Sequence, residues 1–189
     1  ITTNGEQIAY ICTVTLQSAL RKVNEYYVIT PHNKLGPFEI AADISWADEF
    51  NRFTFISIKN NLFYIYAENE EKGPFNIVYM ITPKNKGKIA FLAEESGKNF
   101  LILNSKQGLI SHPIDTLDPL NPPLKWSPNK NKIAFISVES NKQFINIDNN
   151  KKGPFDNIEL FDWSPDSHYL AYLARESNKK NLYVNDIKK

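Results

Sequence analysis

The chain carries an internal repeat. In each copy a bulky apolar residue is followed by Ser or Thr, often by Pro, then by a polar turn and a run of β-branched and aromatic residues. The clearest copies begin at Trp126 and Trp163, and others begin at Ile81, Trp46 and Ile1. These anchors recur about every 35 to 45 residues, which suits a unit of four short strands. Repetition at this period restricts the fold to an array of similar units.

Two short β runs follow each anchor, separated by a polar turn. The first runs are centred on small residues and include Ile8–Ile11, Phe53–Ile56, Ile89–Leu92, Ile133–Ile136 and Leu170–Leu173. A second marker, Gly-Pro-Phe, precedes the next anchor at 36–38, 73–75 and 153–155, and Gly108-Leu109-Ile110 is expected to be its degenerate copy. Short runs punctuated by Gly, Pro, Asn and Asp predict successive β-hairpins.

Two segments depart from this pattern. In residues 14–24, Leu16, Leu20 and Val23 are spaced like one face of a helix, so a short helical turn within a long hairpin is an alternative to strand here. Residues 111–123 contain four prolines, which exclude a central strand and predict a loop.

Composition excludes several classes of protein. The net charge is +1, from 22 basic and 21 acidic residues, so the basic excess typical of nucleic-acid binders is missing. No apolar run approaches the roughly 20 residues that span a bilayer, so membrane insertion is not expected. Cys12 is the single cysteine, which precludes an internal disulfide. The sequence starts at Ile1, in mid-repeat, and targeting is not readable from it.

The Trp-Ser-Pro-Asp/Asn turn and its following Ile-Ala-Phe-type strand resemble the TolB-type, WD-like β-propeller repeat. The match is clearest at Trp126 and Trp163, whereas Asp48 replaces the proline after Trp46, and both Trp and Pro are replaced at Ile1. The resemblance implies four-stranded antiparallel blades arranged radially around a channel. Similar propellers serve as periplasmic envelope proteins, gating domains of serine peptidases and protein-interaction platforms. The resemblance therefore implies a bacterial, periplasmic or envelope location without implying one activity.

We predict an all-β chain in which residues 1–189 form a single β-propeller domain, or a propeller fragment, of about five repeats. Five hairpins follow the anchors, but only four stretches lead from the Gly-Pro-Phe marker or its copy to an anchor, so the ring is expected to be incomplete. Open strand edges are normally covered in proteins. Three arrangements remain open: a fragment of a longer propeller, self-association that closes the ring, and a closed five-bladed ring with one thin blade.

Most conspicuous residues are explained by the repeat. The tryptophans hold a fixed position in it, which favours packing between blades. Asp48 and Asp166 occupy turns in which an Asp side chain bonds nearby backbone N–H groups. His32 and His168 are expected in solvated turns. No Gly-x-Ser-x-Gly elbow or phosphate-binding glycine loop is present, so no catalytic residue and no cofactor is predicted.

The segment 111–123 holds the remaining candidates, His112, Asp115 and Asp118. One His and two carboxylates are a ligand set for a metal ion, but their spacing matches no ligand motif, and no metal is predicted. Long loops on a rigid scaffold often carry function. We therefore expect an exposed loop here, and its three residues are the candidates for a partner-binding loop.

Three functions follow from this reading. The first is a non-enzymatic scaffold that binds a protein or peptide partner. The second is a gating propeller of a serine peptidase whose catalytic domain lies elsewhere. The third is a carbohydrate-active enzyme with paired carboxylates, for which the candidates are Asp43, Asp48, Glu49, Asp115, Asp156 and Asp166.

Overall fold

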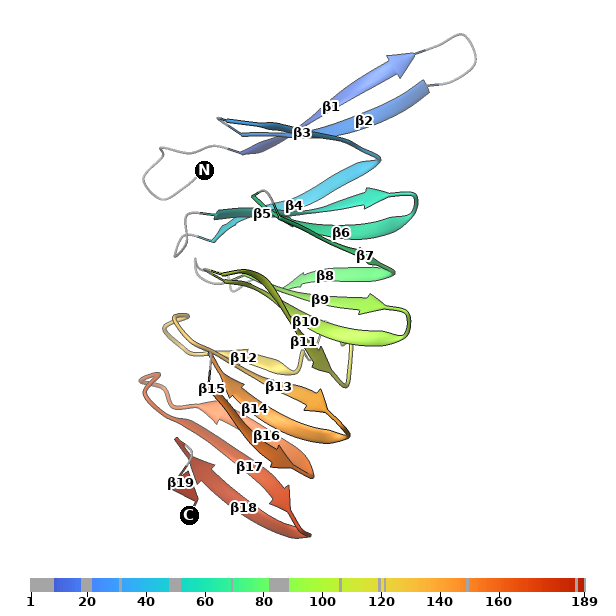
Figure 1. The fold of residues 1–189 in the computed structure, drawn as a ribbon. Coiled ribbons are helices and arrows are strands. Elements are labelled where there is room, and N and C mark those ends of the chain that lie inside the picture. The colour runs from blue at the N-terminus through green and yellow to red at the C-terminus, as the bar shows by residue number, and fades with distance from the viewer. Residues whose placement is uncertain are drawn as a thin grey trace.

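The computed structural model describes residues 9–17, 22–30, 32–47, 52–68, 70–81, 89–105, 107–118, 120, 122–148, 150–185 and 187–188. In these residues the regular secondary structure is entirely β, and the strands form five antiparallel sheets (Figure 1). Strands that are consecutive in sequence are neighbours in each sheet. The expected all-β architecture, with a four-stranded unit, is therefore present.

Four of the five sheets have four strands. The first sheet comprises β1 (Tyr10–Gln17), β2 (Lys22–Ile29) and β3 (Lys34–Phe38). The second comprises β4 (Ile40–Ala47), β5 (Arg52–Lys59), β6 (Leu62–Ala67) and β7 (Glu70–Phe75). The third comprises β8 (Ile77–Ile81), β9 (Ala90–Glu95), β10 (Lys98–Ser105) and β11 (Gly108–Ile114). The fourth comprises β12 (Leu124–Trp126), β13 (Ile133–Glu139), β14 (Lys142–Ile147) and β15 (Asn150–Phe155). The fifth comprises β16 (Asn157–Trp163), β17 (Leu170–Glu176), β18 (Lys179–Val184) and β19 (Ile187–Lys188).

The same tight turn joins the second and third strands of the last four sheets. Its two central residues both have positive φ, as type I′ hairpin turns require. They are residues 60–61, 96–97, 140–141 and 177–178, with φ between 46° and 77°. Asn holds four of these eight positions, Ser three and Gly one, and Asn and Gly adopt positive φ at low cost. The turn fixes the register of each hairpin, so equivalent residues can be compared from sheet to sheet.

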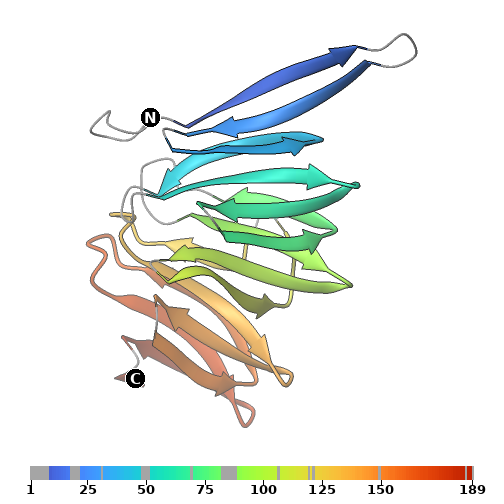
Figure 2. The same ribbon diagram turned by 45° about the horizontal axis from the view of Figure 1, so that its top comes forward.

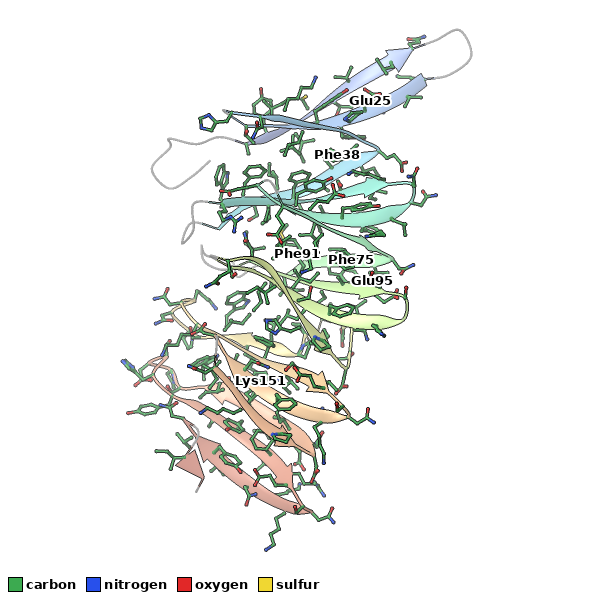
Figure 3. The ribbon with its side chains drawn as sticks, viewed as in Figure 1. Glu25, Phe38, Phe75, Phe91, Glu95 and Lys151 are labelled. Atoms are coloured by element: carbon green, nitrogen blue, oxygen red, sulfur yellow. The ribbon has the colours of Figure 1, made fainter. Side chains whose placement is uncertain are left out.

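The sheets stack face to face in a row, and the first and fifth sheets lie at opposite ends (Figures 1 and 2). A separate hydrophobic cluster fills the space between each pair of neighbouring sheets. Each cluster contains a fully buried aromatic residue from the second strand of the later sheet: Phe55, Phe91, Phe135 or Tyr172. Figure 3 shows Phe75 and Phe91 between the second and third sheets. Side-chain packing between the sheets therefore holds the row together.

Each Gly-Pro-Phe marker lies at the end of the last strand of a sheet. Phe38, Phe75 and Phe155 are each 4–5% exposed, and they pack toward the following sheet. The glycine precedes a shift in register and has a φ between 124° and 140°. The marker thus supplies a bulge and a buried aromatic side chain at every sheet junction that contains it.

The third sheet has no Gly-Pro-Phe, and the residues that take its place differ from those that the sequence suggested. Its last hairpin is two residue pairs longer, because Leu103, equivalent to Ile147 of the fourth sheet, pairs with Ile110 and the ladder continues to Ser105 and Gly108. Ile114 therefore takes the place of Phe155. The expectation that Gly108-Leu109-Ile110 is the degenerate copy is wrong: Pro113 and Ile114 take the places of Pro154 and Phe155, and Gly153 has no counterpart because β11 lacks the bulge.

Two other local predictions need correction. Val14 to Gln17 and Lys22 to Asn24 pair within a continuous β1–β2 ladder, so the helical alternative is wrong for these residues, and 18–21 lie outside the described residues. Residues 111–114 belong to β11 rather than to a loop. Because β11 is an edge strand, Pro113 costs the sheet no internal hydrogen bond.

The tryptophans pack between sheets. Trp163 is buried, and its Nε1 donates to the Lys125 carbonyl oxygen of the fourth sheet at 3.1 Å. Trp46 and Trp126 are partly buried against the clusters of their own junctions. The predicted packing role is confirmed.

Candidate functional site

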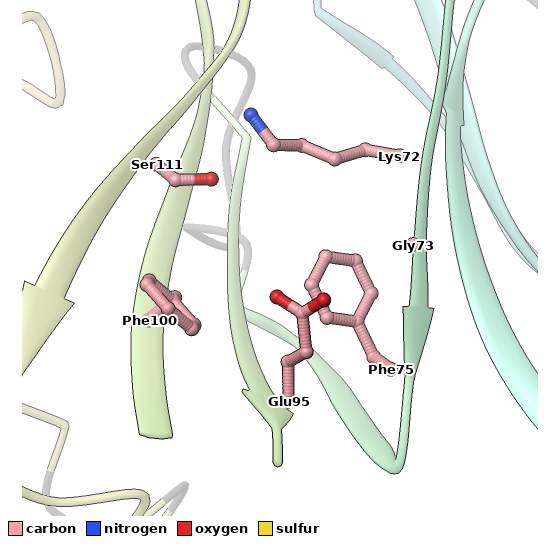
Figure 4. Close-up of a pocket in the computed structure, with 6 residues that line it drawn as sticks. All are labelled: Lys72, Gly73, Phe75, Glu95, Phe100 and Ser111. Atoms are coloured by element: carbon pink, nitrogen blue, oxygen red, sulfur yellow. The ribbon is translucent and has the colours of Figure 1, made fainter. Parts of the chain in front are cut away.

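A cleft opens between the second and third sheets. It encloses about 180 Å³ and is lined by Lys72, Gly73 and Phe75 of β7 on one side, and by Glu95, Phe100 and Ser111 of β9, β10 and β11 on the other (Figure 4). Pockets for drug-sized ligands occupy roughly 300–1,000 Å³. The cleft is therefore of a size for one side chain or a small group.

Both walls of the cleft combine aromatic and charged groups. Phe75 is buried, Phe100 is half-buried, and Glu95 is exposed at the mouth. Figure 4 shows the Glu95 carboxylate extending into the cleft beside the Phe75 ring, with Phe100 on the facing wall. Among the described residues, no hydrogen-bond donor or cation contacts this carboxylate.

Charged residues of β7 fix the edge of the third sheet beside the cleft. Lys72 Nζ donates to the Leu109 carbonyl oxygen at 2.8 Å, and Glu70 Oε2 accepts from the Leu109 N–H at 2.9 Å. The positive charge of Lys72 is therefore directed to the backbone of β11, at the end of the cleft that faces Ser111 (Figure 4). The cleft has an acidic end and a basic end.

The junction between the first and second sheets shows the same position in a filled form. Lys59 is equivalent to Glu95. Lys59 lies five residues after Thr54, and Glu95 lies five residues after Ala90, and Thr54 and Ala90 hold the same place in the ladders β5–β6 and β9–β10. Its Nζ lies 2.8 Å from Glu71 Oε2 and 4.9 Å from the centre of the Tyr64 ring.

A hydrogen-bonded cluster stabilises this filled junction. Tyr66 donates to the Glu71 carboxylate that pairs with Lys59. Burial lowers the pKa of Lys59, but contacts with Glu71 and Tyr66 raise it, and the net shift is upward. Burial alone would raise the pKa of Glu71, and the bonds from Lys59 and Tyr66 hold it below its usual value. The ammonium ion is thus retained as a cation among aromatic rings.

The junction between the third and fourth sheets is filled as well, with the charges exchanged. Glu139 takes the position of Glu95, and Lys151 takes that of Ser111. The two side chains form an ion pair, and Lys151 Nζ lies 4.0 Å from the centre of the Phe144 ring. An ammonium ion over an aromatic ring, paired with a carboxylate, therefore occurs in both neighbouring junctions.

The three site residues suggested by the sequence have separate partners. His112 is half-buried, and its ring lies 4.7 Å from the Phe135 ring, on the face of β11 opposite to the cleft. Burial is the main cause that lowers the pKa of His112, and Lys151 lowers it further. Asp115 Oδ2 accepts from Gln143 Nε2 at 2.8 Å, and Asp118 Oδ1 accepts from the Leu120 N–H at 2.9 Å. Their role in a partner-binding loop stays a prediction.

The repeat turns bear out their structural interpretation. In the last repeat, Ser164 Oγ donates to Asp166 Oδ1 at 2.5 Å, and the same oxygen accepts from the His168 N–H at 3.1 Å. These bonds, that with Ser164 first, lower the pKa of Asp166. His32 and His168 are exposed turn residues, as expected. Asp48 lies outside the described residues.

Residue spacing did not indicate the cleft. The signal was present in the charges that follow the β runs, because Lys59, Glu95 and Glu139 hold one repeat position. That Ser111 stands where a charged partner for Glu95 would be expected is known only from the register of β11. The residues of the described ranges contain no group of three His, Cys, Asp or Glu side chains placed to share a metal ion. They also contain no helix long and apolar enough to cross a membrane.

Comparison with known proteins identifies no family. No family model matches the sequence, and no curated protein matches it. Among solved structures, the chain is similar to TolB from Acinetobacter baumannii, with 12% identity, a TM-score of 0.36 and coverage of 94% of this chain. The chain spans 50% of the length of that structure. The fold is defined by the strands and registers above, because a similarity this low does not define one.

Proposed function

We propose that the five sheets are blades of a β-propeller-type scaffold, and that the scaffold is non-enzymatic and binds a protein or peptide partner. The observation that supports this most is the cleft between the second and third sheets, because ion pairs fill the equivalent positions of the two neighbouring junctions. Its aromatic walls and single exposed carboxylate suit recognition of a side chain. The partner is proposed to insert one residue there.

The carbohydrate-active alternative receives less support from the carboxylates. Asp156 pairs with Lys142 at 2.5 Å, and the Asp166 carboxylate bonds within its own turn. Glycoside hydrolysis requires two carboxyl groups that face one substrate. The gating alternative is tested by the native gene, because an α/β-hydrolase sequence downstream of residue 189 would favour it.

Replacing Phe100 by alanine is expected to weaken peptide binding. Peptides selected from a random display library on the native chain should lose affinity about tenfold or more, because buried aromatic contacts dominate such interfaces. Isothermal titration of the selected peptides measures the change.

The matched control for this experiment is Phe144→Ala. Phe144 holds the same position one sheet later, where Lys151 already covers its ring. Phe144→Ala should leave the affinity of the peptides unchanged, and thermal melting checks that both variants are folded. Selection that yields no specific peptide, or peptides insensitive to Phe100→Ala, would argue against binding in this cleft.

A further inference from the structure

The three junctions between the first four sheets share one arrangement of charged and aromatic side chains, and the middle junction lacks one of the two charges. Each has a charged residue at the end of the second strand and an aromatic ring on the third strand. These pairs are Lys59 with Tyr64, Glu95 with Phe100, and Glu139 with Phe144. The last strand provides the opposite charge in two cases, Glu71 and Lys151, but provides Ser111 in the middle one.

The charge that the middle junction lacks is the cation that would pair with Glu95. In the first junction the ammonium group comes from the second strand, and in the third it comes from the last strand, yet both lie near an aromatic ring and a carboxylate. The middle junction retains a carboxylate, Glu95, and two rings, Phe75 and Phe100. A cleft of about 180 Å³ lies beside them.

We propose that this cleft binds a primary ammonium group, such as a lysine side chain, between Glu95 and Phe100. The inference rests on the proposed binding function and specifies its ligand. The ammonium group would pair with the carboxylate and contact the ring face, and both interactions are favourable for a cation. The resident Lys59 and Lys151 are the chain's own examples of this geometry.

Lys72 limits how such a ligand enters. Its ammonium group bonds the Leu109 carbonyl oxygen at 2.8 Å, and no ring or carboxylate contact is made by it among the described residues. A second cation is therefore expected at the Glu95 end, away from Lys72. Like charges separated in this way weaken binding without excluding it.

The proposal is tested by NMR titration of the native chain with the peptide acetyl-Gly-Lys-Gly-amide, with its Nε-acetylated form as the comparison. The charged peptide should shift the amide signals of residues around Glu95, Phe100 and Ser111, with a dissociation constant of about 1–10 mM. The acetylated peptide, which keeps the length but lacks the charge, should not. Equal shifts and equal midpoints for the two peptides would overturn the proposal.

Three variants identify the groups that act. Glu95→Gln should weaken binding of the charged peptide about tenfold. Ser111→Lys should abolish it, because the new amino group takes the ligand's place. The matched control is Glu139→Gln, which removes the same charge from the next junction and should leave binding unchanged. Undiminished binding by Glu95→Gln or Ser111→Lys would contradict the assignment, as would an equal loss in Glu139→Gln.

The basic end of the cleft provides a further test. Lys72→Gln should bind the charged peptide as well as the native chain or better, because a like charge has been removed. Loss of binding in this variant would show that the ligand is held by Lys72, and would overturn the ammonium assignment.

Failure of this inference can be told from failure of the proposed function. If selected peptides depend on Phe100 but contain no lysine, peptide binding stands and the ammonium inference fails. If the lysine peptide binds as described but selection yields no specific peptide, the ammonium site stands and the wider function fails.

Discussion

Phe91→Ala is expected to lower the free energy of unfolding by about 3–5 kcal/mol, the usual cost of removing a buried phenylalanine side chain. Phe91 is completely buried and belongs to the cluster that joins the second and third sheets. Its neighbours come from both sheets, including Phe75 and Ile102, so collapse of the cavity would require the sheets to move together. Urea denaturation followed by circular dichroism measures the change.

Tyr79→Ala provides the control for this loss. Tyr79 lies on β8 of the same sheet but is 39% exposed, so its removal should cost less than about 1 kcal/mol. A loss in Phe91→Ala as small as that in Tyr79→Ala would show that the junction between these sheets contributes little to stability. That outcome would contradict a stack held together by its inter-sheet clusters.

Gly73→Ala should also destabilise the chain, by about 2–4 kcal/mol, because backbone strain and overpacking both oppose it. Gly73 has a φ of 140°, and a β-carbon there would lie 2.8 Å from the Phe63 carbonyl oxygen and 3.0 Å from Tyr64 Cδ1. The first of these atoms belongs to the backbone of β6 and has little freedom to move. Thermal and urea denaturation should both show the loss.

Gly97→Ala separates strain from crowding. Gly97 has a φ of 77° in the hairpin turn, but a β-carbon there would meet no atom within 4 Å. Its replacement should therefore cost only about 1 kcal/mol, from backbone conformation alone. If Gly73→Ala lowered stability as little as Gly97→Ala, the bulge in β7 could not be packed as closely as described.

The strand positions were readable because turns and β runs alternate so regularly. Ile133 to Ile136 and Leu170 to Leu173, placed after their anchors by sequence alone, lie in β13 and β17. Local turn chemistry decides these hairpins, and it is encoded in adjacent residues. The Gly-Pro-Phe segments were identified for the same reason.

The last strand of the third sheet was not readable. A ladder two pairs longer and the lack of a bulge displace β11 relative to β7 and β15. Spacing along the chain then suggests Gly108 as the marker, whereas pairing shows that Pro113 holds the proline position. Register between strands depends on contacts far apart in sequence, which a repeat alignment does not contain.

The cleft depends on this register, so it could not be predicted. The prolines of 111–123 predict a loop at Ser111, and Glu95 follows the predicted run Ile89–Leu92 where a polar turn is expected. Their relation follows from pairing, because Ser111 lies opposite Ile102 as Lys151 lies opposite Asn146. This comparison shows that the third sheet has a serine where the fourth sheet has a lysine.

If the cleft is an unfilled copy of the neighbouring ion-pair positions, a lysine at residue 111 should fill it. The crystal structure of the Ser111→Lys variant would show this. The introduced amino group should lie over the Phe100 ring and pair with Glu95, as Lys151 lies over Phe144 and pairs with Glu139. An introduced side chain that extends into solvent and leaves the cleft open would contradict it.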